Sequence, residues 1–119
     1  ENTILVGHSC GGGFLLRWLS ENDVKIDKLA LVAPYMYPTK PERELLLSFD
    51  INPDVANRVN EIHIFLADDE DVDGVEKTVE TVMKSLPSSK LHKLSNKGHF
   101  TMDGMGTDEF PELRDVLIK

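Results

Sequence analysis

Cysteine, long apolar runs and clustered basic charge are all scarce in this sequence of 119 residues. Its single cysteine, Cys10, cannot form an internal disulfide, so a reducing compartment such as the cytoplasm is expected. No apolar run approaches the roughly 20 residues that a membrane-spanning helix needs, which argues against a membrane protein. The formal net charge of -8, from 13 basic and 21 acidic residues, argues against a nucleic-acid partner.

The remaining composition is typical of one globular unit, because 40% of the residues are hydrophobic and 29% are charged. A chain of this length buries one core at most. We therefore expect a single domain over residues 1–119.

Short apolar runs alternate with stretches of helical periodicity along the chain. Strands are expected at 3–6, 29–33, 62–66 and 90–94, and helices around 14–19, 75–86 and 111–117. The alternation predicts an α/β fold with a mostly parallel sheet and helices on both faces. Functional groups in such sheets lie beyond the carboxyl ends of the strands. Residues 35–60 interrupt the alternation, and we expect them to form an excursion over that edge.

The sequence Gly7-His8-Ser9-Cys10-Gly11 fits the G-x-S-x-G pattern and lies directly between an expected strand and an expected helix. In a nucleophile elbow the serine sits on a strained turn, so both glycine positions are expected to exclude a Cβ atom. The backbone amide of Cys10 is then expected to point toward a developing oxyanion. An ordinary turn or a phosphate cradle is the alternative, but neither G-x-G-x-x-G nor a Gly-Lys pair is present.

A nucleophilic serine needs a base, and the chain offers four histidines. His8 is expected to point to another side of the elbow, and His63 and His92 lie within strands. His99 follows the last expected strand, and Gly98 frees the backbone beside it to turn the ring inward. We therefore predict that His99 is the base.

Between Ser9 and His99 lies the acidic segment 67–74, which follows the third expected strand. One carboxylate there would orient the imidazole, in the order serine, acid, histidine that this fold uses. The residue types alone do not choose which carboxylate does so.

Three segments resemble the serine hydrolases of the retinoblastoma-binding protein 9 type, an α/β-hydrolase family. They are LVGHS at 5–9, LVAPY at 31–35 and KLHKLSNKGHF at 90–100. The resemblance covers essentially the whole chain and implies a small hydrolase without a cofactor. It also implies Ser9 as the nucleophile and His99 as the base.

The same resemblance implies Asp71 as the acid, if Ala67 takes the place of the small residue that ends the strand. A proline commonly follows the acid in the family, whereas Val72 follows here, so Asp69 and Asp68 remain alternatives. The family's fold also has strands and a glycine-containing loop before the elbow strand, and no segment here corresponds to them. We therefore expect a partial fold whose partner is the missing N-terminal segment.

The expected function is two-step acyl transfer from a small-molecule or peptide substrate, with cleavage of an ester or amide. Tyr35, Met36 and Tyr37 are candidate walls of a substrate pocket. No metal and no organic cofactor is expected. A binding module that keeps the fold without the activity is one alternative.

A calcium-binding loop is the second alternative, because residues 69–80 satisfy the pattern D-x-[DN]-x-[DN]-G-x5-E. Its side-chain ligands would be Asp69, Asp71, Asp73 and Glu80. Such a loop belongs between two helices, whereas the run 62–66 before it is typical of a strand. We therefore favour the triad over calcium.

Overall fold

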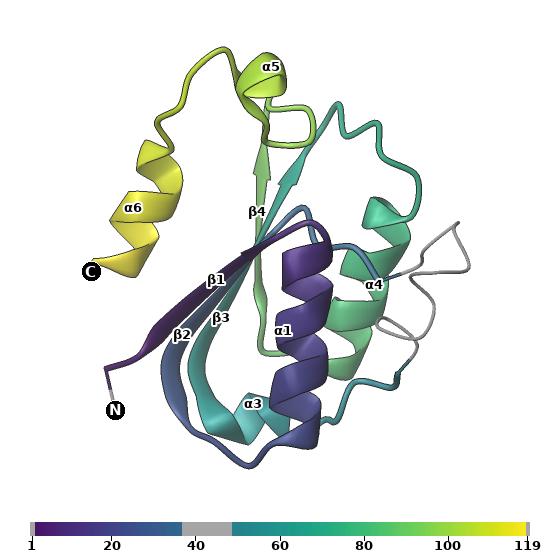
Figure 1. Cartoon of the computed structure of the whole chain (residues 1–119), viewed down its shortest axis with the longest axis vertical. Helices are drawn as coiled ribbons and strands as arrows, with labels where there is room; N and C mark the ends of the chain where they lie inside the picture. Colours follow the sequence, from purple (N-terminus) through teal and green to yellow (C-terminus); the bar gives the residue numbers. More distant parts are fainter. Residues whose placement is uncertain (1, 37–48, 119) are drawn as a thin grey trace.

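The computed structural model describes residues 2–36 and 49–118. Strands and helices alternate along the chain (Figure 1). In order, they are β1 (Ile4–His8), α1 (Cys10–Glu21), β2 (Ile26–Val32), α3 (Val55–Arg58), β3 (Val59–Ala67), α4 (Val75–Ser85), β4 (Lys90–Leu94), α5 (Met102–Met105) and α6 (Pro111–Leu117).

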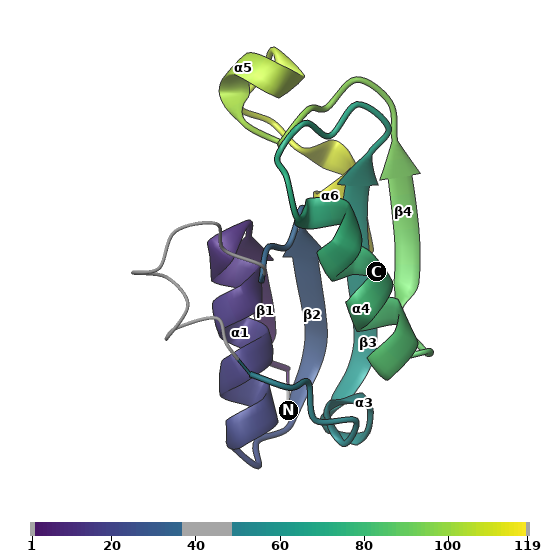
Figure 2. The same ribbon diagram turned by 90° about the vertical axis from the view of Figure 1, so that its right-hand side faces the viewer.

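The four strands form one sheet in the order β1-β2-β3-β4, and every neighbouring pair is parallel. All four carboxyl ends therefore meet at one edge, where the groups that follow each strand come together. Helices α1 and α4 cover one face, and α6 lies on the other side (Figures 1 and 2). The predicted α/β class with a parallel sheet and helices on both faces is confirmed.

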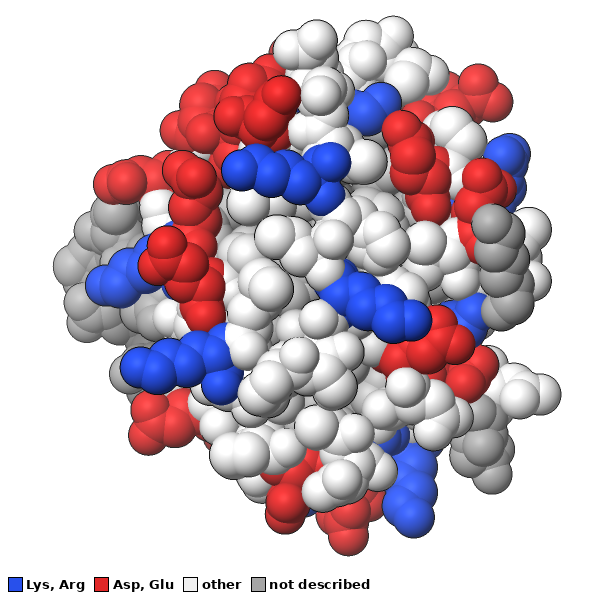
Figure 3. Space-filling model, turned by 180° about the vertical axis from the view of Figure 1, so that it is seen from behind, with Lys and Arg blue, Asp and Glu red and all other residues white. Residues whose placement is uncertain are grey.

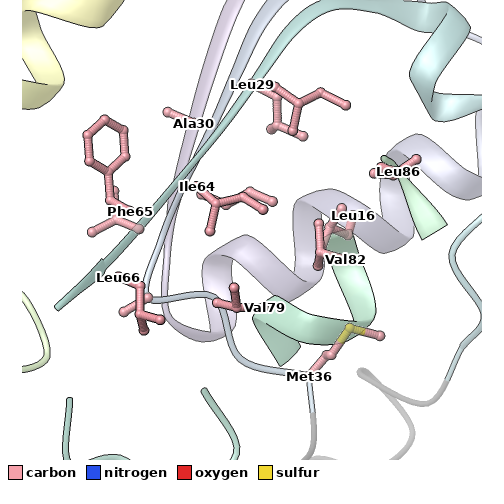
Figure 4. Close-up of a cluster of buried hydrophobic side chains, with 14 of the residues drawn as sticks. Leu16, Leu29, Ala30, Met36, Ile64, Phe65, Leu66, Val79, Val82 and Leu86 are labelled. Carbon is pink, nitrogen blue, oxygen red and sulfur yellow. The ribbon is translucent and has the colours of Figure 1, made fainter. Parts of the chain in front are cut away.

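The core lies mainly between the sheet and the helices α1 and α4. Ile64 points toward Leu16 and Val82 on these helices, and all three side chains are fully buried (Figure 4). Burial of one such aliphatic side chain contributes about 1.5–3 kcal/mol. On the opposite face Phe65 makes an edge contact with Phe110, whose ring centroid lies 5.4 Å away. Because β2 and β3 are covered on both sides, their apolar runs are continuous rather than alternating.

A buried lysine ties α6 to the sheet. Lys28, in β2, is 4% exposed, and its Nζ donates to the carbonyls of Val116 and Leu117 at 3.0 and 3.2 Å. Carbonyls in the last turn of a helix lack partners within the helix, and a cation there also complements the helix dipole. The ammonium of β2 thus caps the C-terminal end of α6.

The expected elements match closely, but two strands are longer than predicted. Strands β2 and β3 each begin three residues before the predicted runs 29–33 and 62–66, and α6 spans the predicted 111–117. The predicted excursion, 35–60, is only partly described, because residues 37–48 lie outside the described part. Its later part does not lie over the carboxyl edge. Asn52 bonds to Ser20 near the end of α1, and α3 leads into the amino end of β3.

On the side opposite to the view of Figure 1, basic side chains are spread singly among white and acidic ones (Figure 3). They form no continuous stripe on this face. Over residues 2–36 and 49–118, none of the helices has the length and apolar character needed to cross a bilayer.

Candidate active site

A tight turn joins β1 to α1 and carries Ser9. Its φ of 58° and ψ of -122° lie outside the regions that a residue with a side chain ordinarily adopts. The carbonyl of Ser9 accepts the backbone N–H of Gly12 at 3.0 Å and that of Tyr35 at 3.0 Å. Hydrogen bonds from α1 and from the segment after β2 therefore hold the turn in place.

The glycine requirement is confirmed at Gly7 and wrong at Gly11. A Cβ at Gly7 would lie 2.7 Å from the Cα of Gly12, which the backbone cannot accommodate. A Cβ at Gly11 would meet nothing within 4 Å. The second tight position is Gly12, where a Cβ would lie 3.1 Å from the Cβ of Pro34. The close approach is thus between the end of β1 and the first turn of α1.

His99 lies in the loop after β4 and reaches Ser9 across the carboxyl edge of the sheet. Its Nε2 is 2.8 Å from the Oγ of Ser9, at hydrogen-bond distance. The imidazole is 15% exposed. The structure therefore brings together the two residues predicted as nucleophile and base.

The carboxylate in contact with His99 belongs to Glu70. The Nδ1 of the imidazole lies 3.1 Å from Oε1 and 3.0 Å from Oε2. The side chain of Glu70 is 1% exposed, and its Oε2 also accepts the backbone N–H of Val72 at 2.9 Å. A proton on Nδ1 donated to this carboxylate leaves Nε2 as the acceptor for the hydroxyl of Ser9.

The expected contact between Asp71 and His99 is therefore wrong, because Glu70 takes that place. Asp71 is exposed and makes no contact with His99 in the structure. The alternatives hold the loop's backbone instead of the ring: Asp68 accepts the N–H of Asn96 at 3.1 Å, and Asp69 accepts that of Gly98 at 2.9 Å. The side chain at position 70 is the one that the loop directs inward.

His8 contacts His99, which the sequence did not reveal. Its Nε2 donates to the backbone carbonyl of His99 at 2.7 Å, and the two rings lie 5.0 Å apart. The side chains of His8 and Ser9 thus both reach His99. The one available signal was position, since His8 ends β1 and His99 lies beyond the end of β4.

The other predicted site residues have different surroundings. Cys10 is the first residue of α1, so its N–H belongs to the turn after Ser9. Tyr35 and Met36 are each 6% exposed and pack in the core, while Tyr37 lies outside the described residues. Contact of these three with substrate stays a prediction.

The calcium interpretation conflicts with the local fold. The acidic segment follows strand β3 rather than a helix, and the carboxylate of Asp69 is engaged with Gly98. Across 2–36 and 49–118, no three histidine, cysteine or acidic side chains are grouped so as to hold a metal ion. A calcium loop needs several of these carboxylates to converge on one point.

The fold has counterparts among solved structures. The ydeN gene product from B. subtilis has a TM-score of 0.79 and 21% identity over 98% of this chain and 64% of that one. A protein described as a predicted CIB-like hydrolase from Thermoplasma acidophilum has a TM-score of 0.61 and 17% identity, over 98% of this chain and 49% of the other. This chain thus spans less than two thirds of either structure.

The sequence comparisons identify the family. A comparison with curated proteins gave no match. The family model described as "Serine hydrolase" matches residues 1–119, which is the whole chain. Together with the hydrolase fold, this match shows that the chain belongs to the serine hydrolase family.

Proposed function

We propose that the chain performs acyl transfer with Ser9 as nucleophile, His99 as general base and Glu70 as the acid that orients the base. The observation that carries this proposal is the continuous set of contacts from Ser9 Oγ to His99 Nε2 at 2.8 Å and from His99 Nδ1 to Glu70 at 3.0 Å. A serine at a strained strand-to-helix turn, within reach of such an imidazole, is the arrangement that nucleophilic hydrolysis requires.

The reaction proceeds in two halves. His99 Nε2 takes the hydroxyl proton as Ser9 Oγ attacks the substrate carbonyl, and then returns that proton to the leaving alcohol or amine as the acyl bond breaks. In the second half, water gives a proton to Nε2 and attacks the acyl carbonyl. The bond from this carbonyl to Ser9 Oγ then breaks, the acid leaves, and Nε2 returns its proton to Oγ. Glu70 stabilises the imidazolium in both halves.

The oxyanion requires donors on the side of the elbow. The backbone N–H of Cys10 is the proposed local donor, because it follows Ser9 at the start of α1. Loss of one such donor costs on the order of 100-fold in rate. We propose that a second donor comes from a loop of a further segment, outside these residues, that completes the fold.

The proposed substrates are small esters, amides or peptides, as the resemblance to the retinoblastoma-binding protein 9 type implies. No step in this scheme needs a metal or an organic cofactor. We place the reaction in a reducing compartment such as the cytoplasm, on the basis of the single cysteine.

A fluorophosphonate probe tests the chemistry directly, because it reacts with an activated serine. The full polypeptide that carries these residues should become labelled at Ser9. Its turnover of a panel of small esters and aminoacyl amides should fall in proportion to the labelled fraction. Absence of labelling with retained binding of such compounds would support a non-catalytic binding module instead.

We also propose that a further segment of the same polypeptide pairs with β1. This strand lies at an edge of the described sheet, where Ile4 and Val6 are 38% and 46% exposed. Nearby, α1 exposes Phe14 and Trp18 at 47% and 37%. An exposed edge with apolar side chains promotes association between chains. Residues 1–119 alone should therefore elute as oligomers, and a monodisperse, fully active monomer would contradict the proposal.

A further inference from the structure

The loop that carries His99 has an unusual backbone on both sides of the base. Asn96, Gly98 and Phe100 all have positive φ, of 58°, 57° and 58°. Only glycine adopts this region without cost, so two of these three conformations must be imposed by contacts with other segments.

Three consecutive acidic residues after β3 contact this loop, two of them at the backbone amides of Asn96 and Gly98. Asp68 Oδ1 accepts the N–H of Asn96 at 3.1 Å, and Asp69 Oδ1 accepts that of Gly98 at 2.9 Å. Glu70 then holds the ring of His99 itself. The loop is therefore attached at two backbone amides and one imidazole.

We infer that Asp69 is a positioning residue for the base, acting through the amide of Gly98 next to His99. This inference rests on the proposed function, since it concerns the same Ser9–His99 contact. Asp69 itself contacts neither ring nor hydroxyl. Its carboxylate holds the Lys97–Gly98 peptide, one residue before His99, and so helps to set the direction in which the imidazole leaves the backbone toward Ser9.

Substitutions of Asp69 can separate its role as a hydrogen-bond acceptor from its negative charge. Hydrogen bonding needs only an oxygen at this point, which asparagine also supplies, whereas a role for the negative charge needs the carboxylate. Asp73 offers a matched control, because it lies in the same loop, carries the same charge and is exposed. Asp69→Ala removes the acceptor, Asp69→Asn keeps it, and Asp73→Ala changes the charge alone.

We expect Asp69→Ala to lower kcat by about 10- to 100-fold with little change in KM, because a misplaced base costs this much. Asp69→Asn and Asp73→Ala should both stay within about 3-fold of the unmodified protein. Wild-type kcat in Asp69→Ala would overturn the inference. An equal loss in Asp69→Asn, with a shifted acid limb of the pH profile, would also overturn it and indicate an electrostatic role.

Two spectroscopic measurements do not depend on turnover. The proton between His99 Nδ1 and Glu70 should give a low-field NMR signal that Asp69→Ala broadens and Asp73→Ala keeps. If Asp69→Ala fails to fold, hydrogen exchange of the Gly98 amide in the unmodified protein tests the contact with Asp69. Slow exchange supports this contact, and fast exchange contradicts it. Failure of the proposed function is recognised separately, by hydrolysis that persists in Ser9→Ala.

Discussion

Two clusters in this molecule join a glutamate to a histidine and then to a third polar group. In one, Glu70 contacts His99 and His99 contacts Ser9. In the other, Glu61 lies 2.9 Å from Nε2 of His63, whose Nδ1 lies 2.9 Å from Nε2 of His92. The distances are almost the same, but the first cluster ends on the hydroxyl of Ser9, whereas the second ends on an imidazole.

The clusters differ in which member is buried. The carboxylate of Glu70 is 1% exposed and the ring of His99 15%, whereas Glu61 is 39% exposed and the ring of His63 only 5%. The outer imidazole, His92, stacks on Phe65 in the sheet. A buried carboxylate behind a more accessible imidazole suits proton transfer at the surface of the site. A buried imidazole with an exposed carboxylate suits only packing, so hydrogen-bond distance alone does not identify a catalytic group.

The largest expected effect is on kcat, and it distinguishes Ser9, at the end of the first cluster, from His92, at the end of the second. Ser9→Ala should lower kcat by at least about 10⁴-fold and abolish probe labelling, and His99→Ala should do the same because the two act as a unit. His92→Ala is the matched control and should keep most of the activity. Steady-state kinetics on purified variants measure this, and substantial esterase turnover in Ser9→Ala would remove the distinction between the clusters.

The next effect separates the two glutamates. Glu70→Gln keeps the shape but no longer favours the tautomer with a proton on Nδ1, so kcat should fall by roughly 10³- to 10⁴-fold. Glu61→Gln should leave kcat unchanged, and so should Asp71→Asn. If Asp71→Asn is instead the variant that loses activity while Glu70→Gln keeps it, the acid must be reassigned to Asp71.

The smallest expected effect is on stability against pH. Burial, followed by the charges of His63 and Lys90, lowers the pKa of His92 below its usual 6.5. The unfolded chain therefore binds this proton at a higher pH than the folded one, and stability falls as the pH drops below 6.5. In His92→Gln this decline should be smaller.

The glutamate of the same cluster acts in a lower pH range. The hydrogen bond from His63, helped by Lys28, lowers the pKa of Glu61 below 4.5. Its contribution to stability is present above 4.5 and is lost as the pH falls through the lower folded-state value. Melting temperatures should be measured from pH 8 to pH 3 for His92→Gln, Glu61→Gln and the unmodified protein. His92→Gln should diverge from the unmodified protein below pH 6.5, and Glu61→Gln below pH 4.5. Identical curves for all three proteins would show that this cluster does not affect stability.

The sequence predicts the framework better than the contacts within the site. Continuous apolar runs mark β2 and β3 because both faces of these strands are covered, and Pro111 marks the start of α6 because proline suits the first turn of a helix. Ser9 and His99 follow from a motif at a strand end and from the position after the last strand. Each of these depends on local order along the chain.

The contacts within the site and the path of the segment 35–60 depend on backbone conformation, which the order of residues does not reveal. Four of the six residues at 68–73 are aspartates, and only the path of the turn after β3 directs Glu70 inward and leaves Asp71 exposed. The contact between His8 and His99 joins residues 91 positions apart. Proline in the segment 35–60 indicates irregular structure, but it carries no information about which edge of the sheet that segment follows.

The ammonium of Lys28 has a consequence for the order of synthesis. It belongs to the second strand, but two of its acceptors are the carbonyls of Val116 and Leu117, 88 and 89 residues later. During translation, a cation that ends up buried must therefore remain hydrated until α6 has left the ribosome. We expect β2 to gain full protection against hydrogen exchange only in nascent chains long enough to expose residue 117, and protection in shorter chains would contradict this.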